Sequence, residues 1–348
     1  MTLAYYPGCS LHGTSREFDE SFKAIAAALP IQMEEIDDWC CCGASSAHAV
    51  DNFLGVALPA RNLALAEAAG HDEVVAPCAA CYNRLASASH AVAHEPGMAE
   101  RVADVLERPF ANSVAVKSVV EVLLEMAPQI AERVAARTTP NPLVGLKLAA
   151  YYGCLLVRPA EVTGFDDSEK PHTMEDVATA CGATPVNWNM AVECCGGAWS
   201  VARTSSVVRL GRSIIDDARK NGADAILVAC PLCHSNLDLR QSAMVRRGEA
   251  PLPVIYITEL VGLALGLDAG EMGMGRHFVA TEPLLAQLQA AAVTRAAEDA
   301  VKAAEAAEKA AARAAKAAAA AKTAAPAAAT AKADAPPAAD EATDGGAE

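Results

Sequence analysis

Ten of the twelve cysteines in this chain form two sets with the same order of motifs. Each set has a single cysteine, then an adjacent pair followed by glycine, then a C-x-x-C motif. The spacings are C-x31-C-C-x35-C-x-x-C and C-x39-C-C-x34-C-x-x-C. The first set is Cys9, Cys41, Cys42, Cys78 and Cys81, and the second is Cys154, Cys194, Cys195, Cys230 and Cys233. Because thiolates are ligands for soft metals and agents of redox reactions, this pattern predicts metal or redox chemistry.

These cysteines are expected to remain reduced. The N-terminal residues show neither the basic start nor the apolar stretch of a secretory signal, so we expect the chain to stay in the cytoplasm. Thiols are kept reduced there, and a chain of 348 residues can bury a core without disulfides. The cysteine count therefore does not indicate a disulfide framework.

Three kinds of bound group suit cysteine donors. A zinc ion takes four ligands, fewer than each set offers, which leaves zinc as a less favoured alternative. Residues 230–234 also spell the C-x-x-C-H signature of covalent haem, but Tyr82 stands at the histidine position in the first set. An iron–sulfur cluster holds several irons and can use more thiolates, and glycines beside the cysteines let the backbone approach it. We therefore favour iron–sulfur clusters, of an unusual type because the chain lacks the C-x2-C-x2-C-x3-C run of ferredoxins.

The sequence around the cysteines repeats as well, which indicates an internal duplication. The matching segments are 4–9 with 150–154 (one residue deleted), 73–78 with 225–230, and 114–123 with 254–261. We predict a first module over residues 1–143, a second over residues 144–280, and a different C-terminal segment over residues 281–348.

Strand and helix signals alternate within each module. Short apolar runs predict buried strands at residues 3–6, 74–76, 148–152 and 226–229. Helical patterns cover residues 55–69 and 203–221. The fold class predicted from this alternation is α/β, with parallel sheets built from βαβ units. Ligands of such sheets bind beyond the carboxyl ends of the strands, where these cysteines fall.

The C-terminal segment has a different composition. From about residue 290 to residue 322 it is mostly alanine with spaced charges, including Glu298 with Lys302 four residues on, which predicts a solvent-exposed helix. From Thr323 onward, proline, alanine, threonine and acidic residues predict a disordered tail.

Overall composition excludes two classes of partner. The formal net charge of −15 argues against nucleic-acid binding, which normally uses a basic face. No run of about 18 apolar, uncharged residues occurs, so the sequence predicts no membrane span.

The duplicated cysteine motif, with the stretches at 5–10, 41–46, 193–197 and 229–233, resembles the CCG or cysteine-rich domain family, and in particular the B subunit of heterodisulfide reductase. The resemblance covers about residues 1–270. It implies two noncubane [4Fe-4S] clusters, one per module. It also implies that the five cysteines of each set are the ligands, and that a small disulfide substrate is split into two thiols between the clusters.

The resemblance also implies partners. A ferredoxin-like C subunit and a flavin-containing A subunit of heterodisulfide reductase would supply electrons, since this chain has no G-x-G-x-x-G fingerprint of its own. Three interpretations of the task remain open. They are a catalytic disulfide reductase, an electron relay as in 2-hydroxy-acid or glycerol-phosphate dehydrogenases, and a non-catalytic metal-binding component. The sequence identifies neither the thiol substrate nor the physiological direction.

Several residues near the sets have no assigned role. Cys40 makes a run of three cysteines, so the adjacent pair is either 40/41 or 41/42, and only 41/42 directly precedes glycine as in the second set. We expect Cys181 to pack at a helix end. His12, His48 and His234 lie near predicted ligands, and none can be assigned as a proton donor.

Overall fold

The structure is a computed structural model that describes residues 1–44 and 46–323. The chain divides into two compact units, Met1–Arg295 and Ala296–Glu348. The tail predicted to be disordered, apart from Thr323 itself, lies outside the described residues.

The larger unit contains two four-stranded sheets in which neighbouring strands run parallel. The first has the order β2-β1-β3-β4 and the second the order β6-β5-β7-β8. The strands are β1 (Thr2–Tyr5), β2 (Gln32–Glu35), β3 (Glu73–Ala76), β4 (Ala115–Ser118), β5 (Lys147–Tyr151), β6 (Thr184–Pro185), β7 (Ala225–Val228) and β8 (Val254–Tyr256). The predicted α/β class with duplicated parallel sheets is confirmed.

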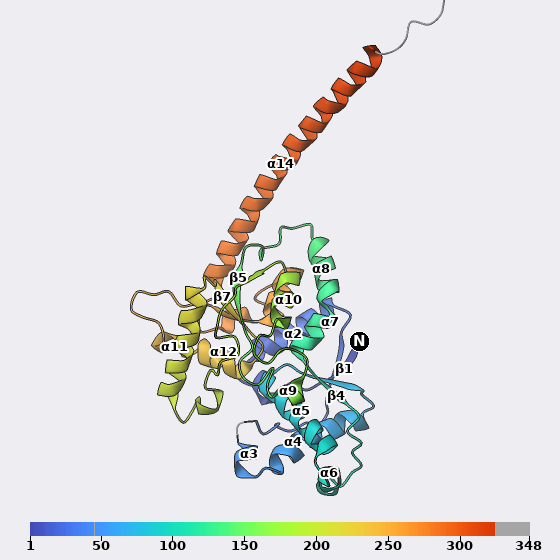
Figure 1. Cartoon of the computed structure of the whole chain (residues 1–348), viewed down its shortest axis with the longest axis vertical. Coiled ribbons are helices and arrows are strands. Elements are labelled where there is room, and N and C mark those ends of the chain that lie inside the picture. Colours follow the sequence, from blue (N-terminus) through green and yellow to red (C-terminus); the bar gives the residue numbers. More distant parts are fainter. Residues whose placement is uncertain (45, 324–348) are drawn as a thin grey trace, which may run out of the picture. The chain divides into compact units, whose positions relative to one another are not determined.

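Helices connect the strands in both halves (Figure 1). In the first half they are α1 (Gly8–Leu11), α2 (Arg16–Ala28), α3 (Ala47–Val50), α4 (Leu54–Ala68), α5 (Ala79–His94), α6 (Met98–Leu106), α7 (Val119–Glu125) and α8 (Ala127–Ala135). The second half has α9 (Ala160–Thr163), α10 (Thr173–Ala180), α11 (Thr204–Lys220), α12 (Pro231–Leu237) and α13 (Ile257–Leu265). Short 3-10 turns are η1 (Gly197–Trp199), η2 (Gln241–Ala243) and η3 (Met274–Arg276).

The strand register relates the two copies. Tyr5 lies opposite Val75, and Ala150 lies opposite Leu227. Val75 and Leu227 each precede the first cysteine of a C-x-x-C motif by three residues. Tyr5 and Ala150 are therefore equivalent, and so are the tyrosines that follow them. No residue is deleted here: the deletion expected from the sequence is wrong, because it aligned the two Tyr-Tyr pairs with each other.

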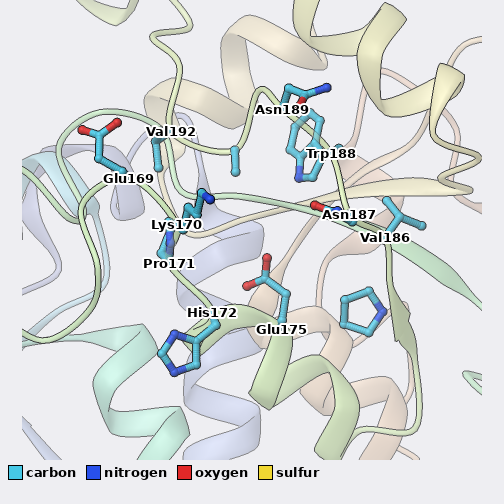
Figure 2. A pocket seen from close by; sticks show the side chains of 12 residues that line it. Glu169, Lys170, Pro171, His172, Glu175, Val186, Asn187, Trp188, Asn189 and Val192 are labelled. Atoms are coloured by element: carbon cyan, nitrogen blue, oxygen red, sulfur yellow. The ribbon is translucent and has the colours of Figure 1, made fainter.

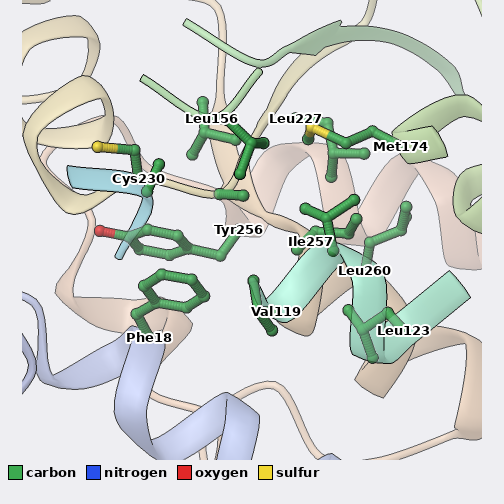
Figure 3. Close-up of a cluster of buried hydrophobic side chains, with 14 of the residues drawn as sticks. Phe18, Val119, Leu123, Leu156, Met174, Leu227, Cys230, Tyr256, Ile257 and Leu260 are labelled. Carbon is green, nitrogen blue, oxygen red and sulfur yellow. The ribbon is translucent and has the colours of Figure 1, made fainter. Parts of the chain in front are cut away.

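The two sheets share one hydrophobic core. Phe18 from α2 and Val119 from α7 pack with Tyr256 and Leu260 from the second half (Figure 3). The rings of Phe18 and Tyr256 stack with their centroids 4.2 Å apart. In Figure 1 helices α7 and α10 lie side by side, and they are in contact. Burial of each such aromatic side chain contributes about 1.5–3 kcal/mol to folding, so this contact holds the two halves together.

Polar contacts also join the halves. The side-chain amide of Asn83 donates to the carbonyl oxygens of Leu155 and Arg158, at 3.0 and 2.8 Å. The hydroxyls of Ser21 and Thr258 lie 2.7 Å apart and are buried. Buried polar groups left unpaired cost about 1–3 kcal/mol each, so these pairs favour one arrangement of the two sheets.

The C-terminal helix α14 runs from Glu282 to Thr323, so it begins about eight residues before the predicted start. Its first turns belong to the larger unit, where Leu288 and Ala292 are buried. From Ala297 to Ala319 its side chains are exposed, as the alanine and charge pattern predicts. Across residues 1–44 and 46–323, no helix combines the length and apolar character needed to cross a membrane.

Candidate iron–sulfur site

The ends of the inner strands position four cysteines. Cys9 lies in α1 just after β1, and Cys78 is the N-cap of α5 just after β3. In the second sheet Cys154 follows β5, and Cys230 is the N-cap of α12 after β7. Because β1 and β3 run parallel, as do β5 and β7, each pair of cysteines emerges at one sheet edge.

In the first site the C-C-G turn meets the C-x-x-C helix. The Sγ atoms of Cys42 and Cys81 lie 3.4 Å apart. The backbone N–H of Gly43 donates to Sγ of Cys41 at 3.5 Å. The thiols of Cys42 and Cys78 both raise the pKa of Cys81. Four of the five predicted ligands thus form a connected group, with Cys9 close enough to influence the pKa of Cys41 by its charge.

The second site repeats this geometry. The Sγ atoms of Cys195 and Cys233 lie 3.5 Å apart, and those of Cys154 and Cys194 lie 3.9 Å apart. The N–H of Gly196 donates to Sγ of Cys194 at 3.3 Å. All five predicted cysteines of this set therefore converge, since Cys233 also contacts Cys230.

The two sites are neighbours. The thiols of Cys78 and Cys230 come close enough across the two halves for each to shift the pKa of the other. The result is a connected series of thiols that passes from the first C-C-G turn, through both C-x-x-C motifs, to the second C-C-G turn. Ordered so that each thiol is followed by its neighbour in space, the series is Cys41, Cys42, Cys81, Cys78, Cys230, Cys233 and Cys195.

Exposure divides each set in the same way. The C-x-x-C cysteines and the second member of each adjacent pair are buried. Cys9, Cys41 and Cys194 are exposed, and Cys154 is half-buried. Each site therefore has an inner side against the other site and an outer side that solvent reaches.

Contacts among the thiols shift their proton affinities. A hydrogen bond from Cys41, with a second from another thiol, lowers the pKa of Cys42 to about 3. A hydrogen bond from Cys154 lowers the pKa of Cys194 to about 6. The neighbouring thiols also lower the pKa of Cys230. A lowered pKa favours the thiolate form of these three side chains, and the thiolate is the form that binds metal.

A pair of tyrosines that the sequence analysis left without a role supports the two C-C-G turns. The hydroxyl of Tyr6 donates to the carbonyl oxygen of Cys40 at 2.7 Å, and that of Tyr151 donates to the carbonyl oxygen of Glu193 at 2.6 Å. The strand register makes the two tyrosines equivalent, so Cys40 and Glu193 occupy matching positions. The only available signal was that each copy has a tyrosine three residues before its first cysteine.

Cys40 itself faces away from the other thiols. Its Sγ contacts the carbonyl oxygen of Leu58 at 3.7 Å, and its backbone N–H donates to the side chain of Asn62 at 2.9 Å. Asn62, which is buried, returns a hydrogen bond to the Cys40 carbonyl oxygen at 3.0 Å. This geometry makes the pair Cys41 and Cys42, rather than Cys40 and Cys41, the counterpart of the pair in the second set.

Two glycines leave space beside the inner thiols. A Cβ atom on Gly8 would lie 2.8 Å from Sγ of Cys81, and one on Gly153 would lie 3.1 Å from Sγ of Cys233. Both glycines have positive φ angles, of 64° and 66°. The two positions, which we call the glycine cradles, therefore bring the backbone close to a cysteine sulfur.

The remaining candidates lie apart from the thiol series. Cys181 is buried at the C-cap of α10, as expected, and burial raises its pKa to about 12. His12 is part-exposed and 3.3 Å from Glu35, and His48 is exposed. His234 is buried against Tyr256, with the ring centroids 4.3 Å apart.

A cavity of about 700 Å³ lies beside the β6 edge of the second sheet (Figure 2). Glu169, Lys170, His172, Glu175 and Trp188 are among its lining residues. No cysteine lines it, so the cavity and the thiol series are different features of the molecule.

Comparison with known proteins agrees with this geometry. Residues 3–86 and 148–238 match the cysteine-rich CCG domain. The chain is 32% identical over 279 residues to the 8-methylmenaquinol:fumarate reductase membrane anchor subunit of Wolinella succinogenes, which covers 80% of this chain and 96% of that one. It is 26% identical over 295 residues to the B subunit of the ferredoxin/F420H2-dependent CoB-CoM heterodisulfide reductase of Methanosarcina acetivorans, covering 82% and 96%.

A solved structure shares the fold. A hypothetical protein from Helicobacter pylori superposes with a TM-score of 0.62 at 13% identity. The match covers 80% of this chain and 52% of that protein, so this chain spans about half its length. The duplicated sheets, the two converging cysteine sets and the two domain matches lead to one conclusion: the chain belongs to the cysteine-rich CCG domain family and carries the domain twice.

Proposed function

We propose that each cysteine set holds one [4Fe-4S] cluster of the noncubane type. The proposed ligands are Cys9, Cys41, Cys42, Cys78 and Cys81 for the first cluster, and Cys154, Cys194, Cys195, Cys230 and Cys233 for the second. The donor chemistry supports this, because thiolates are the usual ligands of iron–sulfur clusters and each set offers one more donor than a zinc tetrahedron uses. The glycine cradles support it as well, since a zinc ion would not require such space.

The function we propose is that of the catalytic iron–sulfur component of a heterodisulfide reductase-like complex. Reduction of a disulfide R–S–S–R′ consumes two electrons and two protons and yields two thiols, and the reverse reaction forms the disulfide. A bound iron–sulfur cluster transfers one electron at a time, so two of them supply the pair. The observation that carries this proposal is the proximity of Cys78 and Cys230, whose thiols shift each other's pKa across the two halves.

The chain's own residues would contribute access and shielding. The exposed thiols of Cys9, Cys41 and Cys194 line the outer side, from which a small disulfide can approach. The buried inner cysteines exclude water from the region where the two sites meet. Tyr6 and Tyr151 hold the C-C-G turns by their hydrogen bonds to backbone carbonyls.

Electrons would come from partner proteins. We propose a cytoplasmic complex with a ferredoxin-like C subunit and a flavin-containing A subunit, and no nucleic acid. The support lies in the names of relatives, which are the B subunits of ferredoxin-linked heterodisulfide reductases from two Methanosarcina species. This chain would receive electrons rather than bind a dinucleotide, in keeping with the missing G-x-G-x-x-G motif.

A second candidate is an electron relay that passes single electrons without cleaving a disulfide. The relative from Wolinella succinogenes favours it, because that protein is 32% identical and is named as part of a fumarate reductase. This candidate keeps the clusters and their ligands and differs only in the task. In this role the chain would resemble the electron-relay subunits of 2-hydroxy-acid and glycerol-phosphate dehydrogenases.

The first test counts metals on protein purified without oxygen. We expect about eight irons and eight sulfides per chain, as two four-iron clusters require. Cys42→Ser and Cys195→Ser should each remove about half of both, whereas Cys40→Ser and Cys181→Ser should remove neither. Full iron content in Cys42→Ser together with loss of iron in Cys40→Ser would instead mean that Cys40 and Cys41 are the adjacent pair of ligands.

The second test separates catalysis from relay. The intact chain, reduced by a one-electron dye, should convert a small disulfide into two thiols, and Cys195→Ser should lose this two-electron turnover. A relay would exchange electrons with the dye but leave every disulfide unchanged. Full turnover in Cys195→Ser would contradict the two-cluster mechanism.

A further inference from the structure

A second group of metal-binding side chains lies apart from the thiol series. His234 in α12, Asp238 at the end of α12 and His277 after η3 are all buried. One potential ligand atom from each of the three lies within 4.8 Å of the other two. The helix brings two of them together, because residues four apart lie on the same helical face.

Each of the two imidazole rings is held in its orientation by a hydrogen bond at Nε2. Nε2 of His234 lies 3.1 Å from the carbonyl oxygen of Val254, and Nε2 of His277 lies 2.8 Å from Oε1 of Glu259. Both partners are hydrogen-bond acceptors, so Nε2 carries the proton in each ring and Nδ1 is left to face the group. Metal-ligating histidines typically donate their other N–H to a carbonyl or carboxylate in this way.

His277 has a ring nitrogen without a partner. Its Nδ1 is buried and makes no hydrogen bond, and the side chain is only 1% exposed. A buried polar atom left unpaired is costly. The charge of Asp238 acts on His277, and the Asp238 oxygens accept the backbone N–H groups of Phe278 and Val279 at 2.7 and 2.9 Å.

Acidic side chains outnumber the cations around this group. Glu17, Asp238 and Glu259 are all buried within one neighbourhood, where the charge of Arg276 opposes the rise in the pKa of Glu17 that burial causes, and Nε2 of His277 lies 2.8 Å from Oε1 of Glu259. No lysine or arginine is among the buried residues of the described chain. Buried carboxylates normally require a paired positive charge, and a divalent cation would supply it.

We propose that His234, Asp238 and His277 bind a zinc ion, through Nδ1 of each histidine and the Asp238 carboxylate. Nitrogen and oxygen donors of this kind hold zinc at about 2.0–2.2 Å. Ligand atoms around such an ion lie roughly 3.4 Å apart, so the ligand atoms move together by at most about 1.4 Å when the ion binds. Water fills the fourth position.

This site is independent of the duplicated cysteine pattern. The first-copy counterparts of His234 and Asp238 are Tyr82 and Ala86, which cannot serve as ligands in the same way. The zinc would link α12, which carries the second C-x-x-C motif, to the segment after η3. It would therefore stabilise the second copy alone.

The test measures zinc and iron per chain on the full protein purified without oxygen or chelators. We expect about one zinc per chain in the wild type. His277→Gln should lose the zinc and keep the iron. His172→Gln is the matched control, since His172 also lies beside two carboxylates but is exposed, and it should keep both metals.

A cobalt-substituted wild type keeps the test decisive if His277→Gln fails to fold. Cobalt held by imidazole and carboxylate shows d–d bands without an intense thiolate charge-transfer band. A strong thiolate band would place the ion on the cysteines and overturn the proposal. So would a wild type that lacks zinc, or a His277→Gln variant that retains it, while the iron content reports on the clusters separately.

Discussion

At the scale of single residues, Gly8 stands where a side chain would collide with the first cysteine site. Gly8→Ala would place Cβ 2.8 Å from Sγ of Cys81, in a backbone conformation with φ of 64°. The left-handed conformation alone costs an alanine about 1–2 kcal/mol. The collision adds a displacement of the C-x-x-C thiol, so we expect Gly8→Ala to lose about half of the bound iron, measured by metal analysis.

Gly70→Ala is the control for that prediction. Gly70 has φ of 82°, but a Cβ there would meet no atom within 4 Å. The two variants therefore share the backbone strain and differ in the contact with sulfur. Gly70→Ala should keep its iron while losing a similar amount of stability in urea. Equal iron in both variants would mean that the glycine serves the turn and not the bound group.

The residues differ in how readily sequence reveals them. The cysteines could be found because ten of them repeat in spacing, and their side chains do converge in the fold. Tyr6 and Tyr151 were missed as supports of the C-C-G turns. Their equivalence follows from the strand register and not from the residues next to them in the sequence. The group of His234, Asp238 and His277 was missed because His277 comes from a segment far along the chain.

At the scale of elements, the strands with apolar runs could be predicted and the edge strands could not. β3 and β7 are buried and rich in valine, leucine and isoleucine, so their sequence pattern is clear. β2 has the sequence Gln-Met-Glu-Glu and is mostly exposed, and β6 has only two residues. These edge strands depend on pairing with β1 and β5, which local sequence does not encode.

Helix α14 has two parts with different roles. Leu288 and Ala292 are buried in the larger unit, and the Arg295 side chain donates to the carbonyl oxygen of Asn141 at 3.2 Å. From Ala297 onward the described side chains of the helix are exposed. A chain ending at Arg295 should therefore unfold in urea at the same midpoint as the full chain and hold the same iron.

A chain ending at Thr281 tests the other part of the helix. Removing Leu288 from its buried position alone costs about 1.5–3 kcal/mol, so this shorter chain should unfold at a clearly lower urea concentration. Two equal midpoints would contradict the division of α14, and a loss of stability already at Arg295 would assign the exposed part a packing role.

At the scale of the whole molecule, two copies of one domain form a single core. The sequence predicts separate modules because the duplication is visible as a repeat in the amino-acid sequence. It does not reveal that Phe18 stacks on Tyr256 or that Cys78 meets Cys230, since residues that pack between copies look like residues that pack within one. The predicted module boundary near residue 143 stays a prediction. What the fold adds is proximity between the two sites.

That proximity has a spectroscopic consequence for the two proposed clusters. Magnetic coupling between paramagnetic centres falls with the cube of their separation, and the Cys78 and Cys230 thiols are close enough to shift each other's pKa. With both centres paramagnetic, the wild-type electron paramagnetic resonance signal should be broadened and relax fast. Cys195→Ser should show a narrow, slowly relaxing signal from one centre, and Cys181→Ser should match the wild type. A wild-type spectrum equal to the sum of two independent signals would contradict adjacent clusters, and with them the delivery of two electrons to one disulfide.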